Sequence, residues 1–369
     1  MEVSRLIHEN PETRFEEHRA VEWLCAVLES RGHAVERGVA GLPTAFRSSM
    51  ELAGQGRVVA FVAEYDGLPV IGHGCGHNLI AGASLGAFLA LEAVGAHLPG
   101  TVSLLGTPGE EGGGGKVTML SRGAFAGCDA ALMFHPAPFT VMIPATLTTA
   151  DVTVSFRGRA SHAAANPENG INALDGVINT FNSMNALRGY MRRDARVHGI
   201  ITRGGESQNV IPEAAEAVFS VRAKDVAYRS ALVQELKRCA EGAALASGAR
   251  VTVTNRGVRN SLTTNRRLIS FFTANLVSLG ERTRAGQPRP FSTDMGDVSH
   301  SVPSIHPTIS ICEEGVSLHS TEFARAAGSE RGREVMLTAA KALAMTAVDL
   351  LTAVQEPHSR RRAAAGERR

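Results

Sequence analysis

The segment GHGCGHN, residues 72–78, places a thiol and two imidazoles within five positions. Cys75 and His77 are two residues apart, so in an extended segment their side chains point to the same side. The glycines around them leave room for close approach of the backbone. Together with carboxylates, a thiolate and imidazoles form a ligand set for Zn²⁺ or a similar divalent ion. A small buried thiol in a glycine-rich turn is the alternative for this segment taken alone.

Acids and a histidine also follow three apolar stretches of the chain. Asp66 follows VVAFVAEY, the pair Glu110 and Glu111 follows VSLLGTPG, and His135 follows AALMF. In open α/β sheets, ligands bind beyond the carboxyl ends of the strands, so these groups can converge on one rim. Taken singly, the acids could be solvated and the histidine could be a packed polar residue. Their shared position at strand ends favours a metal site.

The elements that must position these groups alternate between strands and helices. We expect a buried strand over 57–66, a helix over 79–97, a strand that begins at 101 and runs into the glycine loop, and a strand over 130–138. Such alternation is typical of a parallel or mostly parallel sheet with helices on its faces.

The pattern changes near residue 147 and returns near residue 262. Between these points the expected order is β-α-β-β-α-β, from the strand DVTVSFRGRA to the strand RVTVTNRG, which is typical of a small α+β sandwich. We therefore expect an α/β fold, with a mixed and mostly parallel sheet flanked by helices, and an inserted ferredoxin-like α+β domain. The predicted bounds are 1–147 and 261–355 for the main domain, 148–260 for the insert, and 356–369 for a basic disordered tail.

Composition limits the class of partner and the compartment. Lys and Arg number 38 against 36 Asp and Glu, and no basic stripe with interleaved aromatic residues is present, so a nucleic-acid partner is not expected. Five widely spread cysteines, an odd number, indicate free thiols in a reducing compartment. The N-terminus is too charged for a signal peptide, and no apolar run approaches the roughly 18 residues of a membrane span. We expect a cytoplasmic protein without a membrane partner.

Seven motifs in order, spread over almost the whole chain, resemble the family-20 metallopeptidases in their amidohydrolase branch, subfamily D. They are AEYDGLPVIGHGCGHNLIAG, GTPGEEGGGGKV, FHP, GRASHAA with PENGINALD, NVIP, STDMGDVS and LHSTEF. The branch includes hippurate hydrolase, and the CGHN and GEEGGGGK forms are most similar to a subunit of p-aminobenzoyl-glutamate hydrolase and to a cytosolic dipeptidase. Two departures stand out: Gly109 replaces an alanine, and the chain starts later than such relatives usually do.

The resemblance implies a zinc-exopeptidase-like catalytic domain that holds two divalent ions, Zn²⁺ or Mn²⁺, with Co²⁺ also compatible. It implies hydrolysis of the amide bond of N-acyl or N-aroyl amino acids, or dipeptides, that bear a free carboxylate. Glu110 would serve as general base and then acid toward a metal-activated water. Asp66 would orient one of the metal ligands without contacting the metal itself, and His73 is not among the expected metal ligands. The metal ligands that the resemblance implies are Cys75, His77, Glu111, His135 and His319.

The resemblance also assigns roles to the inserted domain, as a lid and as the dimerisation surface of a homodimer. His162 is similar to a histidine that reaches the active site of a partner subunit. Asn209 and Arg222 are similar to groups that hold the substrate's carboxylate, for which the planar guanidinium of arginine is suited. On its strand, Arg222 would share a face with Ser220, opposite the residues of the insert's own core.

Two further hypotheses remain at this point. One is a non-catalytic family member that binds such small ligands without turnover. The other is a redox or thiol-nucleophile enzyme that uses Cys75. Retention of Glu110 and of every expected ligand favours the hydrolase, since a non-catalytic member would commonly lose one of them.

Overall fold

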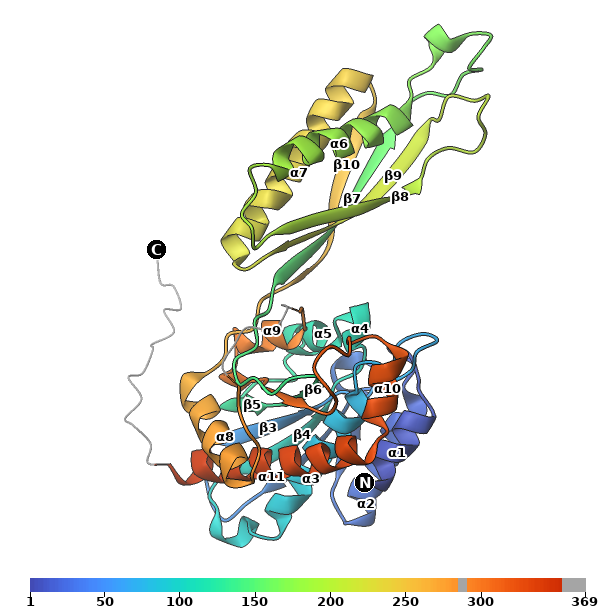
Figure 1. The fold of residues 1–369 in the computed structure, drawn as a ribbon. Helices are drawn as coiled ribbons and strands as arrows, with labels where there is room; N and C mark the ends of the chain where they lie inside the picture. The colour runs from blue at the N-terminus through green and yellow to red at the C-terminus, as the bar shows by residue number, and fades with distance from the viewer. Residues whose placement is uncertain (285–290, 354–369) are drawn as a thin grey trace, which may run out of the picture.

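The computed structural model describes residues 1–284 and 291–353, and Figure 1 shows two bodies joined by two extended segments. The tail expected over 356–369 lies outside the described residues. Each body has a sheet and a hydrophobic core of its own. The predicted class, a mixed and mostly parallel α/β sheet with helices around it, is confirmed.

The main sheet has six strands, and four of them run parallel. Two antiparallel strands complete one edge. In spatial order the strands are β1 (Val35–Arg37), β2 (Phe46–Glu51), β4 (Thr101–Gly106), β3 (Val58–Ala63), β5 (Ala130–Leu132) and β11 (Ser304–Ile305).

Helices cover both faces of this sheet, which explains why its central strand β3 is apolar along its whole length. Val59 and Phe61 of β3 pack into the core on one face, and Ala60 and Val62 pack into the core on the other. On the first face lie α2 (His18–Ser30), α3 (His77–Glu92), α8 (Arg266–Ser278) and α11 (Glu330–Thr352), and on the second lie α5 (Gly115–Ser121) and α9 (Met295–Ser299). The other α-helices of the main domain are α1 (Glu2–Glu9), α4 (Glu110–Gly113) and α10 (Thr321–Ala327).

The single strand predicted over 130–138 is wrong, because the chain leaves the sheet after Leu132. Residues His135–Ala137 form a separate strand, β6, which pairs in parallel with β12 (Thr308–Ser310). Pro136 lacks the N–H that a continued central ladder would require. The break places His135 at the carboxyl end of β5, on the rim of the main sheet.

Helix α11 corrects the expectation that no apolar run is long enough to cross a membrane. By length and composition this helix qualifies, with a mean hydropathy of 1.5 over its best window. The expectation failed because charged residues such as Lys341 interrupt the apolar positions without lowering the average enough. In the structure 61% of that window is buried, and the helix packs against α3 and α8, so burial in the protein core accounts for its composition.

The inserted domain is an antiparallel sheet of four strands with two helices packed on one face. The chain enters this domain from the main domain through β7 and returns to the main domain through β10 (Figure 1). The face opposite the helices is polar and includes Ser220 and Arg222, whereas Phe219 and Val221 point into the core, as predicted. The elements are β7 (Thr148–Arg157), α6 (Ala173–Arg188), β8 (Arg196–Arg203), β9 (Ala214–Ala223), α7 (Val226–Ser247) and β10 (Arg250–Arg259).

Candidate metal centre

Three of the predicted metal ligands meet at the carboxyl end of the main sheet. Cys75 lies in the turn before α3, His77 is the first residue of α3, and His135 is the first residue of β6. Their ligand atoms all lie within 4.8 Å of one another, and the Sγ of Cys75 is 3.6 Å from Nε2 of His135. All three side chains are buried. The arrangement offers one sulfur and two nitrogens to an ion.

Two more groups of ligand atoms overlap with the first. One joins Cys75 to Glu111 and His319, and the other joins His77 to Glu110 and Glu111. The Nε2 of His319 lies 3.5 Å from the Sγ of Cys75 and 3.2 Å from Oε1 of Glu111. Cys75, His77 and Glu111 each belong to two of the three groups, so the groups form one overlapping cluster. All five predicted ligands therefore come together.

The segment GHGCGHN is not extended, so the reasoning that placed two side chains on one side of it was wrong. Gly76 has a φ of 75° and ends the turn, and the helix begins at the next residue. This reversal brings Cys75 and His77 to the same point by a different route. His73 points away from the centre. Its Nε2 lies 3.0 Å from the carbonyl oxygen of Ile7.

His319 enters the centre with a strained backbone. Its φ is 61°, a left-handed region that few residues other than glycine adopt, although histidine adopts it more often than most. Its N–H donates to the carbonyl oxygen of Gly74 at 2.9 Å, which ties this loop to the turn that carries Cys75. Such strain persists where surrounding contacts fix the conformation, and it concentrates at functional sites. About half of the His319 side chain is exposed.

Neighbouring oxygens fix the ring orientation of the two buried histidines. Nδ1 of His77 donates to Asp66 at 2.8 Å, and Nδ1 of His135 donates to the carbonyl oxygen of Pro136 at 2.6 Å. In both rings Nε2 is then the nitrogen that faces the centre, which is how ligating histidines are usually held. Asp66 also accepts the amide of Glu111 at 2.8 Å, through its second oxygen.

Some buried polar atoms at the centre lack hydrogen-bond partners, and a bound cation would interact with them instead. Within the part of the chain that the structure describes, Nε2 of His77 and Oε1 of Glu111 are buried without a hydrogen-bond partner. Glu64 lies 3.4 Å from that nitrogen, but the contact lacks hydrogen-bond geometry. Unpaired buried polar atoms are costly, so the residues present fit a metal site.

The charges of the residues at the centre point the same way. Burial alone would raise the pKa of Glu111, but the nearby His319 and the charge of His77 lower it to about 2. Burial opposes the charge of His77, yet Asp66 and Glu64 hold its pKa well above the usual value. Burial and the neighbouring His77 lower the pKa of His135 to about 4. Burial also raises the pKa of the Cys75 thiol, which a bound cation would reverse.

Glu110 differs from Glu111 in its surroundings although the two are adjacent. Removal from water and the negative charges of Glu64, Asp294 and Glu111 raise the pKa of Glu110 well above its usual value. The two carboxyls thus have opposite tendencies, one to stay ionised and one to take up a proton. Such a pair is suited to one ligand and one proton-transfer group.

Sequence reasoning missed several buried charged residues behind the ligands, although most of them lie inside the quoted motifs. Lys116 pairs with Glu64 at 2.5 Å and with Asp294 at 2.7 Å, and all three are fully buried. His306 lies against His135, with ring centroids 5.4 Å apart, and burial lowers its pKa to about 3. A charge directly after the apolar stretch VVAFVA could have pointed to Glu64, but Lys116 follows four glycines and Asp294 lies in the polar STDMGDVS, so no such signal marks them.

The structure does not bring the predicted substrate-binding residues to the metal ligands. His162 and Asn209 are neighbours on exposed loops at the far end of the inserted sheet, where the N–H of Ala163 donates to the carbonyl oxygen of Asn209. Arg222 is also exposed, but it pairs with Thr149 at the end of the sheet next to the main domain. At about 3.3 Å per residue, the strands separate the two ends by roughly 25 Å.

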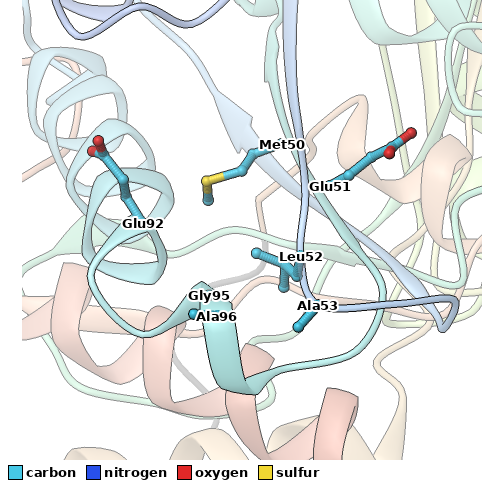
Figure 2. A pocket seen from close by; sticks show the side chains of 7 residues that line it. All are labelled: Met50, Glu51, Leu52, Ala53, Glu92, Gly95 and Ala96. Carbon is cyan, nitrogen blue, oxygen red and sulfur yellow. The ribbon is translucent and has the colours of Figure 1, made fainter.

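A surface pocket of about 320 Å³ lies elsewhere and does not belong to the centre. Figure 2 shows its lining, which includes Met50, Leu52 and Glu92. Leu52 directly follows β2, and the neighbouring end of β4 is its first residue, Thr101. The pocket is therefore at the amino end of the parallel strands, opposite the edge that carries the ligands.

Known proteins share both the sequence and the fold. Residues 53–342 match the model of the peptidase family M20/M25/M40. The Xaa-Arg dipeptidase of Mus musculus is 40% identical over 95% of this chain and 85% of its own length, and a subunit of the p-aminobenzoyl-glutamate hydrolase of Escherichia coli is 32% identical over 95% and 88%. A dinuclear metal-binding peptidase of the M20 family from Bacillus subtilis has the same fold, with a TM-score of 0.73, 21% identity and coverage of 95% and 97%. These matches confirm the family inferred from the seven motifs. The chain belongs to the peptidase family M20/M25/M40.

Proposed function

We propose that this protein is a metal-dependent amidohydrolase that cleaves the amide bond of dipeptides, or of N-acyl and N-aroyl amino acids, with a free carboxylate. The observation that carries the proposal is the overlap of three ligand groups through Cys75, His77 and Glu111, with Glu110 beside them. The relatives support it, since their names are those of a dipeptidase, an aminobenzoyl-glutamate hydrolase and an N-acetyl-L-cysteine deacetylase. No name among them supports the non-catalytic alternative.

The division of labour follows from the two adjacent glutamates. Two divalent ions, when bound, supply Lewis acidity toward the amide carbonyl and lower the pKa of a coordinated water. Glu111 serves as a ligand, because its low pKa keeps it ionised. Glu110 accepts the proton of the water and delivers it to the leaving amine, a role that its position beside Glu111 and His77 allows. Cys75 is a ligand and not a nucleophile in this scheme.

The charge of the site supports two ions. Five carboxylates and the Cys75 thiol surround the centre, against the buried amine of Lys116, so the excess of negative charge favours more than one divalent cation. The five are Glu64, Asp66, Glu110, Glu111 and Asp294. The similar peptidase from Bacillus subtilis is dinuclear, which agrees with this number. We propose Zn²⁺ or Mn²⁺, with Co²⁺ as an alternative, because all three accept sulfur, nitrogen and oxygen ligands.

We propose that the inserted domain closes over the centre and holds the substrate's carboxylate with Arg222. His162 and Asn209 are too far along the sheet to reach the centre of their own chain by a small movement, which favours a role for them in a partner subunit. The edge strand β8 offers a dimer contact, since Ile200 and Ile201 on it are 67% and 45% exposed. We further propose a cytoplasmic location, supported by five cysteines that are all free thiols.

The test is the substitution Glu110→Gln in protein loaded with a defined metal. We expect turnover of benzoyl, aminobenzoyl, acetyl and dipeptidyl amides to fall by at least about 10³-fold, because proton transfer is lost while the shape is kept. Metal content should stay at two ions per chain. Glu313→Gln, an exposed acid in a loop, is the matched control and should leave both quantities unchanged. Full activity in the Glu110 variant, or in chelated wild-type protein, would sink the mechanism; the second result would favour a thiol enzyme.

A further inference from the structure

The segment that carries Glu110 and Glu111 has little conformational preference of its own. Within the short element α4 (Glu110–Gly113), Glu111 and Gly112 have non-helical backbone angles, and residues 109–116 are called the loop below. In its sequence, GEEGGGGK over 109–116, glycine occupies five of eight positions, so the unconstrained loop would sample many conformations. Gly109 itself has a φ of 66°, and a Cβ there would lie 2.8 Å from the ring of Phe15. Both observations favour glycine at position 109. They also mean that contacts from outside must hold the loop in place.

A buried carboxylate from the N-terminal segment holds the first end of the loop. Oε1 of Glu17 accepts the amide of Gly109 at 2.8 Å and the amide of Phe15 at 2.8 Å. Oε2 accepts the hydroxyl of Thr44 at 2.8 Å. The Glu17 side chain is fully buried, and each of its oxygens has a partner. Gly109, whose amide Glu17 holds, directly precedes Glu110, the residue that we assign to proton transfer.

A second buried carboxylate holds the other end. Oδ2 of Asp294 accepts the amide of Lys116 at 3.0 Å, and Oδ1 accepts its Nζ at 2.7 Å. Asp294 is fully buried and lies in STDMGDVS, a motif to which the reaction itself gives no role. Between the two ends, Asp66 holds the amide of Glu111. The loop is therefore bound at its start, middle and end by carboxylates from three separate segments.

We propose that Glu17 and Asp294 are positioning residues for the hydrolytic reaction, because they fix the two ends of the loop that places the Glu110 carboxylate. Hydrogen bonds from backbone N–H groups to carboxylates are short and strong, so each one restrains a glycine-rich backbone effectively. The proposal rests on the proposed function for its effect on rate, and on the hydrogen bonds alone for its effect on the loop.

The test compares Glu17→Ala with Glu17→Gln. Alanine removes all three hydrogen bonds, whereas glutamine keeps an acceptor oxygen for Gly109 and Phe15 and an amide that can donate to Thr44. We expect kcat of Glu17→Ala to fall by about 10- to 100-fold, as for a small misplacement of a catalytic group, with KM little changed. Glu17→Gln should recover most of the rate. Asp294→Ala should act like Glu17→Ala. Asp294→Asn, which keeps the shape of the side chain and one acceptor oxygen, should exchange the loop amides faster than wild type, and wild-type exchange in it would exclude Asp294 from the proposal.

A second readout does not depend on activity. Hydrogen exchange of the loop amides over 109–116, measured in metal-free protein, should be about 10- to 100-fold faster in Glu17→Ala than in wild type or Glu17→Gln. If no substrate is turned over by the wild-type enzyme, the proposed function fails but this arm still tests the loop.

Glu12→Ala is the matched control. Glu12 lies on the same segment and accepts the amides of Arg19 and Ala20 at 3.1 and 3.0 Å, but its side chain does not contact the loop. We expect this variant to lose stability while it keeps both kcat and loop protection. The proposal is wrong if Glu17→Ala retains wild-type kcat and exchange, or if Glu12→Ala loses them equally.

Discussion

Asp66 and His77 form the pair that sets the orientation of the metal centre. Their Oδ1 and Nδ1 atoms lie 2.8 Å apart, and both side chains are buried. Because Nδ1 is occupied, Nε2 faces the other ligands. The second oxygen of Asp66 holds the amide of Glu111, so one carboxylate aligns two ligands from different loops.

Asp66→Asn should therefore weaken metal binding without unfolding the protein. We expect affinity for Zn²⁺ to fall by roughly 10- to 100-fold, as for other partners of ligating histidines. Competition with a chromogenic chelator measures it. Asp129→Asn is the matched control, because Asp129 also accepts a backbone amide, that of Val58, but at the opposite end of the sheet. Equal affinities in the two variants would contradict the role of Asp66.

Cys75→Ala should remove a metal ligand rather than a nucleophile. We expect metal content to fall below two ions per chain, and activity to return in part when the metal concentration is raised. Burial raises the pKa of this thiol, so alkylation of the metal-free protein at pH 8 should be slow. Cys128→Ala, a partly buried thiol outside the centre, is the control. A Cys75→Ala protein with full metal content and no activity would instead indicate thiol chemistry.

Lys116→Met should be strongly destabilising, because it leaves Glu64 and Asp294 without their counter-charge in a fully buried site. Removing one partner of a buried ion pair costs about 3 to 5 kcal/mol in the free energy of unfolding. Urea denaturation measures it. Lys341→Met, an exposed lysine on α11, should change stability by about 0.5 kcal/mol or less. A small effect at Lys116 would mean that water reaches the triad.

Glu17→Gln should stabilise the metal-free protein only at higher pH. Burial and the negative charge of Asp66 raise the pKa of Glu17 to about 7 from an ordinary value of 4.5. Below pH 4.5 the group is neutral in both folded and unfolded chains, so the two proteins should be equally stable. As pH rises from 4.5 to 7, the unfolded wild type ionises first, and its stability falls by up to about 3 kcal/mol relative to the glutamine variant. Urea titrations at several pH values check it, and a stability difference independent of pH would contradict it.

Mixing two inactive variants tests whether subunits share active sites. If His162 acts in a partner's site, a heterodimer of Glu110→Gln and His162→Ala chains has one site with both groups intact. An equal mixture that exchanges subunits should then recover about a quarter of wild-type activity. Recovery should disappear when a chain that carries both substitutions is mixed with a chain that carries either one of them. No recovery despite exchange, or a fully active monomer in sedimentation, would place His162 outside the reaction.

Four of the metal ligands could be predicted because they follow strands, and parallel strands bring their carboxyl ends to one edge; His319 came only from the resemblance. Cys75, His135 and Glu111 each come directly after such a strand or in the loop beyond it. The residues that hold them could not be predicted in this way. Glu17 and Asp294 contact one loop from positions far apart in the sequence, and no spacing relates them. The break between β5 and β6 was missed for the same reason, since it depends on pairing with β12, which the chain reaches only after the inserted domain.

The position of His319 in the chain has a consequence for how the protein is made. The inserted domain pairs all its strands within one continuous stretch, so it can fold soon after Arg259 leaves the ribosome. The metal centre has to wait, because His319 and β11 emerge later still. At typical rates of synthesis, roughly ten seconds or more pass between the synthesis of Cys75 and that of His319. During that time Cys75 and the neighbouring ligands lack His319. Newly made chains therefore pass through a stage with a finished insert and an unfinished metal centre, during which chelation or thiol oxidation can intervene.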